Sequence, residues 1–344
     1  MSFSQIIGQE TAKHILREAI LKEKLPHAYL FTGIPGVGKT STAKALLMAL
    51  NCPETPPGES CGACPACRQV SSGNSPDFVI MERESNSQVI KVEQIRDLNR
   101  RLGFAPFGKY RVCVFEEAER MNLEAANSFL KTLEEPPPGN ILILNTADPA
   151  DLLPTIVSRC QRVRFQPLKN DEIVQWLKVN KNASHEMAEI LAAFSGGSLG
   201  IAMDIYEGDF LEKRKEWISR IKKLNQISRD EAFGLAVLCA DDAKRMGLDS
   251  LDRGSVGILD MLKVWGLWYR DVLLSCTNDP DQLIVNSDQR TTLKNYAENF
   301  DVEKLLESIW IIDRAQRDLK QMRNIRLVME YTAMRLNCLA TSVN

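Results

Sequence analysis

The sequence is poor in several features that would define a function at once. Only three of its 344 residues are histidine, too few and too far apart for a histidine-based metal or catalytic site. Its 43 basic and 45 acidic residues leave a net charge of −2, so no overall positive field draws the chain to nucleic acid. No apolar run reaches the roughly 18 residues of a membrane span. We therefore expect an ordinary globular protein of two or three domains with no membrane partner.

The most informative stretch opens with a phosphate-binding loop, Gly33-Ile-Pro-Gly-Val-Gly-Lys-Thr40. An expected buried strand precedes it and an expected helix, Thr40–Leu50, follows it. In such a loop, backbone N–H groups surround a β-phosphate, while Lys39 reaches the β- and γ-phosphates and Thr40 ligates Mg²⁺. A chance match in a glycine-rich turn is the alternative, which the flanking elements disfavour. The residues predicted to bind ATP or ADP with Mg²⁺ are Gly33, Pro35, Gly36, Val37, Gly38, Lys39, Thr40 and Ser41.

Four cysteines follow one helix later, at Cys52, Cys61, Cys64 and Cys67. Their spacing suits a tetrahedral Zn²⁺ site, and four thiolates leave no open position for catalysis, so we expect a structural role. The segment between them is rich in glycine and proline, and a metal would supply the folding energy that it lacks. Redox chemistry is disfavoured because these Cys-x-x-Cys pairs do not begin a thioredoxin-like unit.

Disulfide bonds are the other alternative for these cysteines. Met1–Gln5 shows neither the basic start nor the apolar run of a secretory signal. We therefore expect a cytoplasmic, reducing compartment, in which disulfides are rare.

Residues 1–166 alternate apolar strands with amphipathic helices, a pattern typical of an α/β fold with a parallel sheet. Strands are expected at Ala28–Phe31, Phe78–Met81, Arg111–Phe115, Ile141–Thr146 and Arg162–Phe165, and helices at Glu10–Lys22, Val92–Leu102 and Leu123–Leu133. From Pro167 onward the pattern is helical. We expect a small helical lid over 167–208 and an all-α domain over 209–344.

Polar side chains close two of the expected strands. Glu116 and Glu117 follow Arg111–Phe115, where a phosphate-loop ATPase places one carboxylate for Mg²⁺ and one that polarises water. An Asp usually fills the first position, and an acidic strand end without a catalytic role fits these residues equally well. At the end of the next strand, Asn145 or Thr146 is placed to sense a γ-phosphate. Simple capping of the strand end is the alternative.

Arg159 follows a short expected helix in Leu153–Gln161. An exposed arginine there is suited to neutralise charge on the triphosphate of a neighbouring subunit, as an arginine finger does. From spacing alone, a surface arginine in an ion pair is at least as common.

Together these motifs resemble the clamp-loader branch of the AAA+ ATPases, found in bacterial DNA polymerase III. The matching segments are Ile7-Gly-Gln9, Leu25-Pro-His-Ala28, Gly33–Thr40, the four cysteines, Asn127-Ser-Phe-Leu-Lys-Thr-Leu-Glu-Glu-Pro136, Asp148-Pro149 and Ser158-Arg-Cys160. The resemblance covers residues 1–207 and continues more weakly beyond them. It implies an AAA+ domain over 1–166 with a zinc module at 52–67, a lid, and a C-terminal collar that oligomerises. It also implies that Arg159, in Ser-Arg-Cys, is the arginine finger.

The type of subunit is indicated by departures from the motor pattern. Motor subunits carry an arginine in a Gly-Ser-Leu-Arg-like motif of the lid, where this chain has Gly200. Asn324–Glu330 and Trp268–Asp271 resemble the collar of delta-prime subunits, the stators of the loader. The resemblance thus implies that the chain assembles with gamma/tau motor subunits and a delta subunit. It also implies that this assembly acts on the sliding clamp and primed DNA, in the replisome at the nucleoid. Whether the chain hydrolyses ATP stays undecided, and two rivals stay open: an active gamma/tau-like motor and a stand-alone zinc-dependent DNA-binding ATPase.

Overall fold

The computed structural model describes residues 2–84, 87–246, 257–276, 284–298, 300–321 and 323–341. The chain divides into two compact units. The first comprises Met1–Glu172 with Gly196–Gly200, and the second comprises Ile173–Ser195 with Ile201–Asn344. The predicted borders after 166 and 208 stay predictions.

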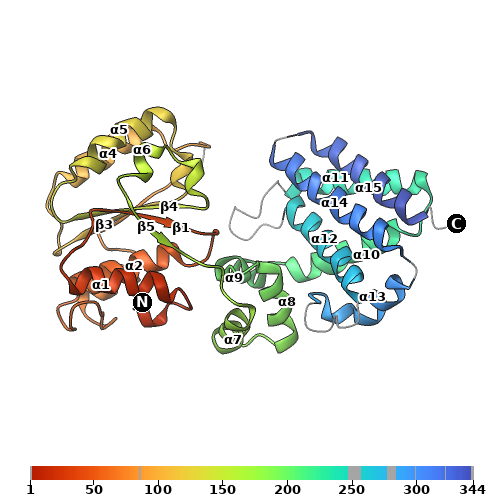
Figure 1. Ribbon diagram of the computed structural model, residues 1–344, viewed down its shortest axis with the longest axis horizontal. Coiled ribbons are helices and arrows are strands. Elements are labelled where there is room, and N and C mark those ends of the chain that lie inside the picture. The colour runs from red at the N-terminus through yellow and green to blue at the C-terminus, as the bar shows by residue number, and fades with distance from the viewer. Residues whose placement is uncertain are drawn as a thin grey trace. The chain divides into compact units, whose positions relative to one another are not determined.

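The first unit is built on a five-stranded parallel sheet in the order β2-β3-β4-β1-β5 (Figure 1). Its strands are β1 Ala28–Thr32, β2 Phe78–Met81, β3 Arg111–Phe115, β4 Asn140–Thr146 and β5 Gln161–Arg164. The predicted parallel α/β sheet is confirmed, and each strand lies within one residue of its expected bounds. The three central strands are buried along their whole length, as expected when helices cover both faces.

Alternate side chains of the strands enter two separate cores. Tyr29 and Phe31 pack toward α1 Glu10–Leu21 and α2 Lys39–Asn51, together with the cysteine segment and its helix α3 Pro65–Ser71. Leu30 packs on the opposite face, which is covered by α4 Val92–Leu102, α5 Leu123–Glu134 and α6 Pro154–Val157 (Figure 1). The sheet is therefore a middle layer, and its carboxyl edge carries the loops discussed below. Short 3₁₀ turns are η1 Phe3–Gln5, η2 Ala118–Arg120 and η3 Pro149–Asp151.

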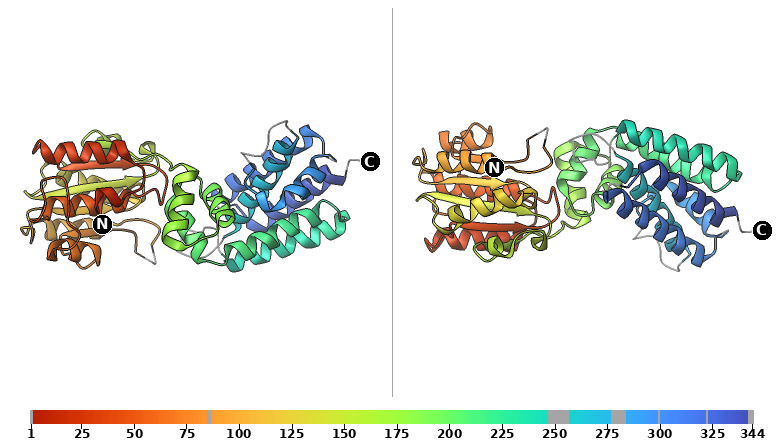
Figure 2. Two further views of the ribbon diagram at one scale, coloured as in Figure 1. Left: turned by 90° about the horizontal axis from the view of Figure 1, so that it is seen from below. Right: turned by 90° about the horizontal axis from the view of Figure 1, so that it is seen from above.

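The second unit is helical wherever it is described with regular structure. Its helices are α7 Asn170–Lys181 and α9 Leu199–Glu207 (both of which begin in the first unit), α8 His185–Ser195, α10 Phe210–Leu224, α11 Arg229–Met246, α12 Ile258–Ser275, α13 Arg290–Ala297, α14 Val302–Lys320 and α15 Ile325–Thr341, with the 3₁₀ turn η4 Ser287–Gln289. Figure 2 shows α10 to α15 lying side by side. Trp265, Trp268 and Tyr269 are buried between them, so these aromatics serve packing.

Buried polar contacts fix one loop of the helical unit. Asp271 is fully buried and accepts hydrogen bonds from the backbone N–H groups of Val285 and Asn286, at 3.1 and 2.7 Å. Arg214, also buried, donates to the Asn286 side chain at 2.6 Å and pairs with Asp288 at 2.7 Å. Burial raises the pKa of Asp271. The Trp268–Asp271 motif thus anchors the segment that leads into α13.

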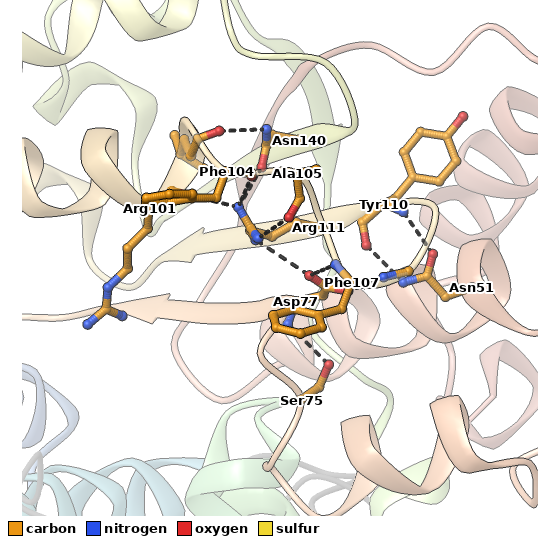
Figure 3. Close-up of polar contacts among 12 residues, drawn as sticks. Asn51, Ser75, Asp77, Arg101, Phe104, Ala105, Phe107, Tyr110, Arg111 and Asn140 are labelled. Carbon is orange, nitrogen blue, oxygen red and sulfur yellow. Dashed lines mark hydrogen bonds and ion pairs between the residues drawn. The ribbon is translucent and has the colours of Figure 1, made fainter.

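A second buried network lies in the first unit, between α4 and β3 (Figure 3). Arg111 donates to the backbone carbonyls of Arg101, Phe104 and Ala105 at 2.9, 3.0 and 3.2 Å. Its Nε lies 3.5 Å from Asp77, whose carboxylate accepts from the N–H groups of residues 107 and 108 at 3.0 and 2.6 Å. This buried ion pair therefore holds an exposed loop, residues 103–110, in one conformation.

Candidate nucleotide site and cysteine cluster

The phosphate-binding loop, residues 33–38, connects the end of β1 to the start of α2. Gly33 has φ +152°, and a Cβ built on it would lie 2.6 Å from the carbonyl oxygen of Phe165. Gly38 has φ +105° and directly precedes the first helical residue. Glycine suits position 33 because a Cβ would clash there, and it suits position 38 because a φ of this sign is strained for other residues. The loop thus presents the free N–H groups of a helix N-terminus at the carboxyl edge of the sheet.

Lys39, the first residue of α2, is turned toward this loop. Its Nζ donates to the backbone carbonyls of Gly33 and Ile34, at 2.5 and 3.0 Å. Burial lowers the pKa of Lys39, and the nearby charges of Glu116 and Glu119 partly oppose that shift. An ammonium in this place lies where the loop motif requires a phosphate partner.

Three side chains meet beside the loop: one from α2, one directly after β3 and one from β4. The Thr40 hydroxyl donates to the carboxylate of Glu116, the residue after β3. The side-chain amide of Asn145 donates to Thr40 Oγ1 at 3.2 Å and to Glu116 Oε2 at 3.1 Å. The Glu116 carboxylate therefore lies directly on Thr40 and Asn145.

This trio fits a Mg²⁺ ion by its chemistry. A hydroxyl and a carboxylate oxygen are ligands that Mg²⁺ takes together with water and phosphate oxygens. The oxygen of the Asn145 amide is buried and has no hydrogen-bond partner among the described residues. Such an orphaned acceptor beside Thr40 can be satisfied by water bound to the ion.

The other predicted polar residues have different neighbours. Glu117 has φ +47°, and its carboxylate lies 3.7 Å from Arg83 Nε and 3.9 Å from Arg120 Nε. The Thr146 hydroxyl donates to the backbone carbonyl of Asp148 at 2.9 Å, which closes the turn after β4. Of the two sensor residues weighed at the strand end, Asn145 is therefore the one that contacts Thr40 and Glu116.

The segment Gly196–Gly200 lies directly on the phosphate-binding loop. The Ser198 hydroxyl donates to the carbonyl of Pro35 at 2.8 Å, and the Gly200 N–H donates to the carbonyl of Gly36 at 2.9 Å. A Cβ built on Gly200 would lie 2.8 Å from the Cα of Gly36. The position thus has no room for a side chain in this arrangement. The sequence drew attention to Gly200, but nothing in it pointed to the contact made by Ser198.

The four cysteines of the cluster come together as free thiols. All four Sγ atoms, those of Cys52, Cys61, Cys64 and Cys67, lie within 4.8 Å of one another. Backbone N–H groups of Ala63 and Cys64 donate to Cys61 Sγ at 3.4 and 3.2 Å, and they lower the pKa of that thiol. Four sulfurs at this separation, with N–H groups directed at them, fit a tetrahedral metal ion such as Zn²⁺.

The relatives of this chain are replication proteins. The family model described as "DNA polymerase III, delta subunit" matches residues 8–169. DNA polymerase III subunit delta' of Bacillus subtilis is 31% identical over 330 residues, which cover 95% of this chain and 96% of that relative. The chain belongs to the clamp-loader subunit family of DNA polymerase III.

Tau subunits of DNA polymerase III match this clamp-loader subunit as well. DNA polymerase III subunit tau of Bacillus subtilis is 29% identical over 356 residues, covering 97% of this chain. The chain spans 61% of the length of that relative. A solved gamma subunit-related protein from Thermotoga maritima aligns over 96% of this chain and 99% of its own, at 17% identity and a TM-score of 0.43. Within the described part of the chain, no helix meets the length and apolarity of a membrane span.

Arg159 of this clamp-loader subunit follows α6 and, among the described residues, has one side-chain partner from another element. Its Nε and Nη2 atoms donate to Glu134 Oε1, at 3.0 and 2.6 Å. Glu134 is the last residue of α5 and lies in the quoted Asn127–Pro136 motif. Sequence reasoning gave Glu134 no role, although the motif itself was the available signal.

Proposed function

We propose that this chain is the delta-prime, or stator, subunit of its clamp loader and supports the ATP-dependent loading of the sliding clamp on primed DNA. The main observation in support of this proposal is the close contact of Gly200 with the phosphate-binding loop. Motor subunits of the family have an arginine there, whereas this position lies against Gly36 without room for a side chain. The delta' relative, which matches nearly end to end, supports the same assignment.

Nucleotide binding is the first part of the proposed function. Residues 33–41 hold ATP or ADP, with Lys39 on the phosphates and Thr40 and Glu116 on Mg²⁺. The ion would neutralise phosphate charge. Glu117 is paired with Arg83 and Arg120, and Thr146 is bonded to Asp148. Because both side chains are engaged away from the phosphates, this arrangement supports weak or absent hydrolysis at this site.

The chain contributes to catalysis through Arg159, which acts in trans on ATP bound to a neighbouring gamma/tau motor subunit. The collar, 209–344, joins the gamma/tau and delta subunits in a ring, and the lid, 167–208, connects it to the AAA+ domain. The cysteine module, 52–67, holds a structural Zn²⁺. The assembly works in the replisome at the nucleoid, within DNA polymerase III holoenzyme.

An active gamma/tau-like motor is the second candidate. The intact loop with Thr40, Glu116 and Asn145 in contact favours it, as does the tau relative that covers 97% of this chain. A stand-alone DNA-binding ATPase has less support, because the chain carries a net charge of −2.

Reconstitution with the gamma/tau and delta subunits separates the candidates. We expect the isolated chain to bind nucleotide without turnover, Arg159→Ala to abolish most ATPase of the complex, and Lys39→Ala to leave most of it. A motor would instead turn over ATP alone and lose that activity with Lys39→Ala. Normal ATPase of the complex after Arg159→Ala would contradict the stator function.

A further inference from the structure

The motif Leu130-Lys-Thr-Leu-Glu-Glu-Pro136 at the end of α5 has structural explanations for some of its residues. Leu133 is buried in the core under α4 and α5. Thr132 donates to the side chain of Asn99 at 2.7 Å, which ties α5 to α4. Glu134 and Glu135 are both exposed, and packing explains neither.

Glu134 differs from Glu135 in what it contacts. A guanidinium group is a planar fork with five N–H donors. The edge formed by Nε and Nη2 of Arg159 is bonded to Glu134 Oε1 at 3.0 and 2.6 Å. Nη1 donates to the Thr155 carbonyl at 2.9 Å and lies 3.5 Å from Ser158 Oγ. Within the described residues, these contacts engage at most four of the five N–H groups, so Nη2 keeps at least one N–H, on the edge that it shares with Nη1, for another acceptor.

The edge between Nη1 and Nη2 is the second edge of the guanidinium on which a phosphate can be recognised. Two parallel N–H groups on one guanidinium edge can bind a phosphate or carboxylate in a bidentate manner. The Arg159 side chain as a whole is 36% exposed. A free arginine side chain samples many rotamers, and holding one edge removes much of that freedom before the phosphate arrives.

We propose that Glu134 is a positioning residue for Arg159: it holds one edge of the guanidinium so that the other edge faces the phosphate of a neighbouring subunit. The inference rests on the proposed role of Arg159 in trans. Glu134 touches neither nucleotide nor metal, and its effect passes through Arg159. Because the pair is exposed, it contributes little to folding, and its effect appears in turnover instead.

The test uses the complete reconstituted complex, with sliding clamp and primed DNA. Glu134→Gln keeps the size of the side chain and removes its charge, and Glu135→Gln is the matched control on the next residue. We expect Glu134→Gln to lower kcat of the complex ATPase on the order of tenfold, with KM for ATP nearly unchanged. This loss is smaller than the roughly 10³–10⁵-fold that an arginine finger itself contributes. Glu135→Gln stays near wild type, and the melting temperature of each variant chain is unchanged.

A double variant shows whether Glu134 acts through Arg159. We expect Glu134→Gln combined with Arg159→Ala to show the same residual ATPase as Arg159→Ala alone. A further loss in the double variant, or wild-type kcat for Glu134→Gln, would overturn the positioning role. If Arg159→Ala itself has no effect, the proposed function fails instead, so the two failures are told apart in one experiment.

Discussion

The backbone N–H of Gly200 donates to the carbonyl oxygen of Gly36 at 2.9 Å, which joins the first turn of α9 to the middle of the phosphate-binding loop. Because both partners are glycines in close backbone contact, this hydrogen bond depends on the absence of a side chain at Gly200. The same contact that excludes an arginine at this position also covers the loop.

Substitution of Gly200 should therefore be costly. We expect Gly200→Ala to destabilise the chain by about 1–3 kcal/mol, because its Cβ would press on backbone atoms that cannot rotate away. Gly234→Ala is the control, since Gly234 lies in α11 with nothing within 4 Å of its built Cβ. That change should be neutral or stabilising by about 1 kcal/mol. Urea unfolding of both variants measures the difference, and equal stabilities would show that the contact is unimportant.

The two acidic residues after β3 should differ in their effect on nucleotide binding. Glu116 contacts Thr40, so Glu116→Gln should weaken Mg²⁺-dependent ATP binding about tenfold, the equivalent of one lost charged ligand. Glu117 is directed at Arg83 and Arg120, so Glu117→Gln should change the affinity less than twofold. Titration with a fluorescent ATP analogue, with and without Mg²⁺, compares them. The same loss in both variants would contradict the assignment of Glu116 to the ion.

The cysteine cluster should carry metal in the purified chain. We expect about one Zn²⁺ per chain by elemental mass spectrometry, and removal by a chelator should cost about 4 kcal/mol of stability if zinc is near 1,000 times its Kd. Cys64→Ser should lose the ion, whereas Cys276→Ser, at an exposed cysteine outside the cluster, should retain it. A Cys64→Ser chain with full zinc content would exclude the cluster as the metal site.

The buried pair of Arg111 and Asp77 should be far more sensitive than an exposed pair. Arg111→Met leaves the Asp77 carboxylate buried without its counter-charge, and we expect a loss of about 3–5 kcal/mol. Lys91→Met breaks the exposed pair with Glu84, at 3.3 Å, and should cost no more than about 1 kcal/mol. Urea unfolding of the two variants checks this, and a small effect of Arg111→Met would mean that the loop over 103–110 is held by other contacts.

Local sequence patterns predicted much of this fold. The features that they did not predict depend on contacts between residues far apart in the sequence. Mostly apolar runs such as Arg111–Phe115 gave strands within a residue, because burial on both faces leaves a clear signal. The cysteine spacing likewise predicted a cluster that the structure brings together. By contrast, Ser198 reaches Pro35 across 163 residues of sequence, and Glu134 meets Arg159 from a different element. Neither contact produces a periodic pattern of residues in the sequence.

Helix α2 connects three regions of the first unit: the phosphate-binding loop, the cysteine cluster and the loop over 103–110. Helix α2 begins at Lys39 in the nucleotide loop and ends at Asn51, next to Cys52 of the cluster. The Asn51 side chain donates to the carbonyl of Tyr110 at 2.8 Å and accepts from its N–H at 2.9 Å. Tyr110 ends the loop that exposes Phe104 and Phe107, which are 73% and 85% accessible. Opening of any one region should therefore speed amide hydrogen exchange in the other two, as parts of a single cooperative unit.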